Sequence, residues 1–95
     1  MTGDNTPDLI ATTELLGAWP NPAVNSTEIK YQIKGYVVNQ NATISVYNIR
    51  GELVKTVKGT NGRATLDTSD LGQGIYLYKL QTDTFTDVKK LIVVK

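Results

Sequence analysis

The sequence predicts an all-β fold, an immunoglobulin-like antiparallel β-sandwich of about seven strands. Val, Ile and Thr, which favour a pleated and half-buried backbone, supply 29 of the 95 residues. Apolar and polar side chains alternate in short segments, and turn-forming residues separate these segments at intervals of roughly 8–12 residues. No helix of usable length is expected, because the helical spacing within Thr12–Trp19 contains Gly17 and is followed by Pro20.

The alternation of apolar residues places the strands. In 28–36, for example, Ile29, Tyr31 and Ile33 share one face. In chain order the predicted strands are 14–19, 28–36, 42–47, 52–58, 63–67, 75–82 and 85–94. The last strand ends in apolar residues on both of its faces. We therefore expect it to lie at the centre of a sheet or to be covered.

Turn chemistry supports the same order of strands. Asn48–Gly51 is typical of a type I turn closed by a glycine in the left-handed region, which is the G1-bulge hairpin. Asn61-Gly62 is typical of a type I′ turn, in which both central residues need a positive φ. It predicts a hairpin between 53–58 and 63–67. Asp83 and Thr84 indicate a third short connection.

Two further motifs have structural interpretations. Gly74, two residues before Tyr76, loosely matches the tyrosine corner of immunoglobulin-type sandwiches. The segment Pro20–Ala23 contains two prolines, which lack a backbone N–H, so it should end an edge strand and stop it from pairing with another chain. Trp19, just before this segment, is expected to plug the end of the sandwich; stacking on a sugar ring is the alternative.

Composition excludes several classes of function. The chain has no Cys and no His, so a disulfide framework, a thiolate nucleophile, a Ser-His-Asp triad and the usual zinc ligand sets are absent. The net charge of +1 argues against nucleic-acid binding. The longest wholly apolar run, Leu91–Val94, is far below the roughly 18 residues that span a bilayer, so direct membrane insertion is not expected.

Acidic residues offer no clear active site or metal site. Four carboxylates could supply oxygen ligands to calcium, but their spacing matches no known loop, and turn formation explains Asp67 and Asp70 better. These candidates are Asp67, Asp70, Asp83 and Asp87. A small enzyme is disfavoured, since no paired acids lie in a credible pocket. We predict no catalytic residues, no metal and no cofactor.

The C-terminal segment combines charge with apolar residues. Lys89, Lys90 and Lys95 flank Leu91–Val94, which comprises Leu91, Ile92, Val93 and Val94. In the structural interpretation, the lysines keep a hydrophobic strand from pairing with other chains. In the functional interpretation, a receptor captures this strand by strand addition or grips the free C-terminus. The residues alone leave both open and favour the first.

Four blocks of the sequence, taken together, resemble a known family. They are Trp19–Ala23, Ile44–Val54, Leu66–Tyr76 and Lys89–Lys95. In this order and at this spacing they are similar to the C-terminal sorting domain, type A, of type IX secretion cargo. The family motif falls on Pro20, Asn21, Pro22, Gly51, Gly74 and Tyr76, which we expect to be mainly structural, and on the tail. Trp19 and Glu52 depart from the residues that the family more often has there.

The resemblance implies an address label rather than an enzyme. In the family, the domain is recognised by an outer-membrane translocon and its shuttle protein, and a sortase-like protease usually removes it. The cargo passes through the periplasm and ends at the outer membrane and cell surface or is released. The tail Lys89–Lys95 is then the expected recognition element.

The charge distribution suggests a boundary within the chain. Residues 1–26 carry −3 and residues 27–95 carry +4. The acidic start of the chain is typical of a flexible linker, and the resemblance, which begins at about residue 18, implies that the linker 1–17 contains the cleavage region and that 18–95 is the sorting domain. The domain is expected to be a monomer or a weak strand-exchanged dimer. The alternative function is a carbohydrate-binding or adhesive β-sandwich module of a secreted protein.

Overall fold

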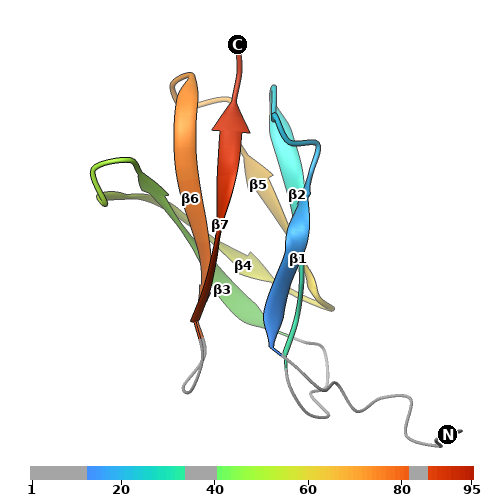
Figure 1. Cartoon of the computed structure of the whole chain (residues 1–95). Coiled ribbons are helices and arrows are strands. Elements are labelled where there is room, and N and C mark those ends of the chain that lie inside the picture. Colours follow the sequence, from blue (N-terminus) through green and yellow to red (C-terminus); the bar gives the residue numbers. More distant parts are fainter. Residues whose placement is uncertain (1–12, 34–40, 82–85) are drawn as a thin grey trace, which may run out of the picture.

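The computed structural model describes residues 13–33, 41–81 and 86–95, and these form a sandwich of two antiparallel sheets (Figure 1). The strands are β1 (Glu14–Trp19), β2 (Ser26–Gln32), β3 (Ala42–Asn48), β4 (Leu53–Gly59), β5 (Arg63–Asp67), β6 (Gly74–Gln81) and β7 (Thr86–Val93). The smaller sheet has the order β1-β2-β5 and the larger has the order β4-β3-β6-β7. The all-β sandwich prediction is confirmed, and the described ranges contain no helix that could cross a membrane.

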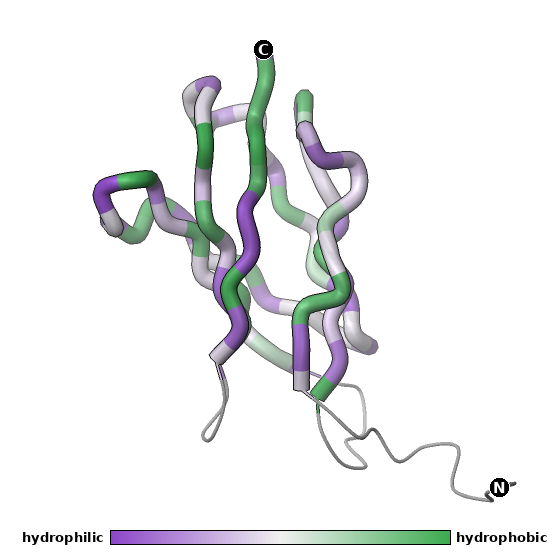
Figure 2. The backbone as a smooth tube through the Cα atoms, in the orientation of Figure 1, coloured by the Kyte–Doolittle hydropathy of each residue, from purple (hydrophilic) through white to green (hydrophobic). Residues whose placement is uncertain are grey.

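The two sheets bury the apolar face that period-two alternation gives to each strand. Ile29 and Tyr31 of β2 and Ile44 and Val46 of β3 belong to one core, and all four side chains are buried. The remaining core residues are Leu15, Ala23, Ala64, Leu66, Tyr76, Tyr78, Leu80, Leu91 and Val93. Figure 2 shows this alternation as hydrophobic and hydrophilic stretches along the strands.

The first predicted turn is confirmed. The N–H of Gly51 donates to the carbonyl of Asn48 at 3.0 Å, and Gly51 has a φ of 85°. The register between β3 and β4 shifts after Val46, which is the bulge that such a turn produces. The Asn48 side chain supports the loop by accepting the N–H groups of Arg50 and Glu52.

The second turn is confirmed, but its hairpin is wrong. Asn61 and Gly62 both have a positive φ, and Thr60 pairs with Arg63 across them. Beyond that pair the chain changes sheet, so β4 pairs with β3 and β5 pairs with β2. Gly59 marks the crossing, because a Cβ there would collide with the ring of Tyr31. The turn therefore joins the two layers of the sandwich.

The tyrosine corner is present. The hydroxyl of Tyr76 donates to the carbonyl of Gly72 at 2.7 Å, four residues upstream, and the ring packs in the core. This bond fixes the connection between β5 and β6 to the start of β6.

The last strand is not central. β7 forms one edge of the larger sheet and, among the strands that the structure describes, pairs only with β6. It is covered in a different way, since Ala23 forms a bridge with Val93 and β7 also lies beside β1 (Figure 1). The expectation of a covered strand is thus met by the segment that follows β1.

Candidate recognition surface at the C-terminal strand

Some of the predicted recognition residues on β7 lie in the core, and others lie on the surface. Leu91 and Val93 are fully buried between the sheets. Ile92 and Val94 are half-buried, and Lys89 and Lys90 are exposed. Figure 2 shows the strand hydrophilic at its centre and hydrophobic toward the C-terminus. A receptor that binds the folded domain can therefore contact the two lysines directly, but not Leu91 or Val93.

The free edge of β7 is closed by residues just after β1. The Asn21 side chain donates from Nδ2 to the carbonyl of Lys90 at 3.1 Å, and its Oδ1 accepts the N–H of Ile92 at 3.0 Å. The N–H of Ala23 donates to the carbonyl of Ile92 at 2.7 Å, and its carbonyl accepts the N–H of Val94 at 2.9 Å. We call Asn21–Ala23 the clasp. It occupies the positions that a strand added by a partner would need.

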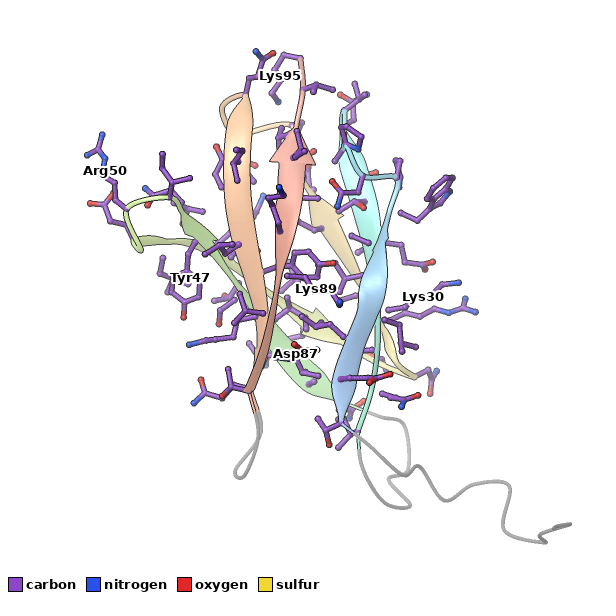
Figure 3. All side chains as sticks on the ribbon, viewed as in Figure 1. Lys30, Tyr47, Arg50, Asp87, Lys89 and Lys95 are labelled. Carbon is purple, nitrogen blue, oxygen red and sulfur yellow. The ribbon has the colours of Figure 1, made fainter. Side chains whose placement is uncertain are left out.

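Asp87 holds the other half of the same edge. Its Oδ1 accepts the N–H of Val88 at 3.0 Å, and its Oδ2 accepts the N–H of Leu15 in β1 at 2.8 Å. Figure 3 shows Asp87 and Lys89 in the region between β7 and β1. One carboxylate thus bridges the last strand of one sheet to the first strand of the other.

Lys95 is tied to the connection between β5 and β6. Its Nζ donates to the carbonyls of Thr68 and Ser69, at 2.9 and 3.1 Å. Its backbone N–H donates to Oε1 of Gln73 at 3.2 Å. The side chain remains exposed at one end of the sandwich (Figure 3), so its positive charge is held at a fixed place rather than free to move.

The family-motif residues divide into two groups. Asn21 bonds to the tail and Pro22 lies within the clasp, whereas the carbonyl of Pro20 accepts the hydroxyl of Thr27 in β2 at 2.7 Å. Gly51 lies in the β3–β4 turn, whereas Gly74 begins β6 with a φ of 154° and pairs with Val93 of the tail. Tyr76 supports the corner described above. Sequence reasoning missed the roles of Asn21 and Asp87, because no local signal reports a partner about 70 residues away in the chain.

Trp19 does not plug the sandwich. It is 79% exposed and, with Leu16, Glu28 and Lys30, lines a shallow hollow on the outer side of the smaller sheet. The cause is a bulge in β1. Leu15 pairs with Tyr31 and Gly17 with Lys30, so Leu16 is an extra residue that reverses the faces after it.

The acidic residues form turns and one ion pair. Asp67 accepts the N–H and hydroxyl of Ser69, and these hydrogen bonds lower the pKa of Asp67. Lys55 lies 2.7 Å from Asp70, and its hydrogen bond lowers the pKa of that carboxyl. Asp83 lies outside the described residues. Within the described ranges, no group of three or more His, Cys, Asp or Glu residues could hold a metal ion.

The family of the chain is decided by comparison with family models. The model of the secretion system C-terminal sorting domain matches residues 17–94. The chain belongs to this family. It is the sorting domain of type IX secretion, a family that signals export across the outer membrane through the secretion machinery and is not a catalytic one. Searches of curated proteins and of solved structures each found no match.

Proposed function

We propose that this sorting domain is read by the type IX translocon and its shuttle protein through the exposed groups of Lys89–Lys95, and that a sortase-like protease then removes it. Family membership and the position of the tail on the sandwich surface support this function. The observation that carries the tail proposal is the fixed display of cations. Lys89 and Lys90 are exposed on β7, and Lys95 is anchored at the end of the sandwich.

The clasp favours one mode of recognition over another. A strand that adds to the free edge of β7 near Lys90–Val94 would have to displace the hydrogen bonds of Asn21 and Ala23. Contacts to side chains need no such opening. We therefore propose that the tail is read in the folded state by its charges and by Ile92, and that Leu91 and Val93 act by keeping the strand in place.

The removal step belongs N-terminal to β1. Proteases act on exposed, extended backbone, and such backbone concentrates at termini and loop tips. From Leu15 onward the chain is protected, because Leu15 is buried and its N–H is bonded to Asp87. We propose that, within the predicted linker 1–17, cleavage falls before Glu14. The cargo then passes through the periplasm and ends at the cell surface or outside the cell.

The test uses a reporter with a signal peptide, fused to residues 1–95 in a bacterium with a type IX system. We expect the reporter at the surface or in the medium, and in the periplasm when the translocon is deleted. The tail variant Lys89→Glu with Lys95→Glu should lower the surface fraction. The matched control Lys30→Glu with Arg63→Glu, on the smaller sheet, should not. Periplasmic retention of the unaltered fusion would overturn the function.

Carbohydrate binding is the second candidate, and one observation favours it. Trp19 is exposed beside Glu28 and Lys30 in an open hollow, an arrangement that can stack on a sugar ring and bond its hydroxyls. Binding of the isolated domain to a glycan array, abolished by Trp19→Ala, would support this candidate.

A further inference from the structure

The outer face of the larger sheet carries an exposed apolar row. The strand registers pair Leu53 with Tyr47, Tyr47 with Leu77, and Leu77 with Lys90, so these four residues form one row across β4, β3, β6 and β7. Leu53 is 56% exposed and Leu77 is 38% exposed. Leu53 lies on the edge strand β4, Tyr47 on the central strand β3 and Leu77 on the central strand β6. A contiguous exposed apolar surface of this kind is typical of an interaction site.

Ile75 and Val88 widen the row. Ile75 precedes Leu77 by two residues on β6 and so shares its face, and Val88 stands two residues before Lys90 on β7. They are 48% and 45% exposed. The apolar surface therefore continues over the paired strands β6 and β7 on both sides of the row.

Lysines lie on one side of this apolar surface and at one end of the row. Lys79 pairs with Val88 in register, Lys58 with Thr43, and Lys90 ends the row. The Nζ of Lys79 lies 5.0 Å from the centre of the Tyr47 ring, which it helps to orient, and this lysine lowers the pKa of Tyr47. We call this surface the basic face: the apolar row, Ile75, Val88 and the three lysines.

The charge of the larger sheet is one-sided. Its four strands contain five lysines and one carboxylate, Asp87. Asp87 is engaged by the N–H groups of Leu15 and Val88, and Lys55 is paired with Asp70. Among the described residues, Lys58, Lys79 and Lys90 have no acidic partner. The smaller sheet differs, since its strands carry acids and bases in nearly equal number.

We propose that the basic face docks an acidic protein surface with an apolar centre, on a component of the export machinery. This rests on the proposed function. An apolar centre with a charged rim is the usual anatomy of a protein interface, and three unpaired lysines select and steer an acidic partner. A second copy of this chain would set lysines against lysines, so self-association through this face is disfavoured.

The experiment alters the face without touching the tail. In the reporter fusion, Lys58→Glu with Lys79→Glu should lower the surface fraction by at least about fivefold, because like charges then oppose the partner. Lys58→Arg with Lys79→Arg should restore export. Lys30→Glu with Arg63→Glu makes the same change of charge on the smaller sheet and should leave export within about twofold, since surface changes outside an interface have small effects. Thermal unfolding of the purified domains checks that each variant folds.

A photo-crosslinking residue at Leu77 identifies the occupant. We expect an adduct with a protein, with Asp or Glu residues near the crosslinked position. An adduct with lipopolysaccharide or with a second copy would overturn the proposal, as would equal export of the Glu and Arg pairs. If the unaltered fusion is exported and the face variant is exported equally, the proposed function stands and only this inference fails. If the unaltered fusion stays in the periplasm, both fail.

Discussion

Asn21 does with one side chain what a neighbouring strand does with its backbone. It stands between Pro20 and Pro22, which have no N–H to donate, so the backbone at these two positions has fewer groups for pairing. The amide supplies a donor to Lys90 and an acceptor to Ile92 instead. The residue thus closes the edge of β7 while the flanking prolines discourage any further strand from adding there.

Replacement of Asn21 should weaken the fold measurably. Asn21→Ala removes two hydrogen bonds, and because water can reach the freed backbone groups we expect a loss of about 0.5–2 kcal/mol in the free energy of unfolding. Urea denaturation followed by circular dichroism measures this. Asn25→Ala is the control, since the hydrogen bond of Asn25 to Thr68 uses its backbone carbonyl. Equal stability of the two variants would contradict the role of the amide.

At the scale of residues, the turns could be predicted from local sequence. Contacts between residues far apart in the sequence could not. Gly51, Asn61 and Gly62 have positive φ because their turn types require it, and the requirement is visible within four residues of sequence. Trp19 was misplaced because one extra residue in β1 reverses the faces after it. No rule of composition or spacing indicates such a bulge from the sequence.

At the scale of elements, β7 serves structure and display at once. Leu91 and Val93 complete the core from its inner side, and Val88 and Lys90 on its outer side belong to the basic face. Its alternation was predicted from the sequence. Its place at an edge was not, because a strand that is apolar on both faces fits the centre of a sheet equally well. The partner that covers it comes from the opposite end of the chain.

Deletion of Leu91–Lys95 should unfold the domain, and not only prevent its recognition by the export machinery. Loss of a single large buried side chain costs about 2–5 kcal/mol, whereas a whole domain is stable by only about 5–15 kcal/mol. The deletion removes Leu91 and Val93 together, along with the bonds of the clasp. We expect no cooperative thermal transition by circular dichroism.

The control for this deletion lacks Lys95 alone and should still unfold cooperatively. A cooperative transition in the longer deletion would show that β7 is dispensable for folding. For the same reason, loss of export after such a deletion does not establish recognition. The charge variants of Lys89 and Lys95 distinguish a loss of recognition from a loss of folding.

The β4–β5 connection shows a further limit at the element scale. The turn type could be predicted, but the sheet to which each strand belongs could not. That choice depends on which strands bury each other's faces, here with Gly59 against Tyr31 where the layers cross. Pairing therefore has to be read from the assembled molecule.

At the scale of the whole molecule, positive charge gathers on the larger sheet and, through Lys95, at one end of the sandwich, whereas the smaller sheet is nearly balanced. The sequence total of +1 conceals this, because composition does not report which lysines share a face. The recognition tail was predicted by resemblance, whereas the basic face emerges only when four strands are set in register.

The stability of the whole fold should fall in acid. The pKa values of Asp67 and Asp70 are lowered in the folded state, so their contribution is present above the ordinary value near 3.8 and is lost as the pH falls below it. We expect a lower melting temperature at pH 3 than at pH 5. Lys55→Met should reduce that difference, because the Lys55 hydrogen bond is the main cause for Asp70. Lys58→Met is the control; an identical pH response in both variants would contradict the assignment.

The pairing of Asn21–Ala23 with Lys90–Val94 joins segments about 70 residues apart, and the later one is the last strand of the seven. A polypeptide that lacks β7 cannot form these bonds, and it also lacks the core residues Leu91 and Val93. If the tail is read in the folded state, as proposed above, export selects domains in which the first and last strands have already come together.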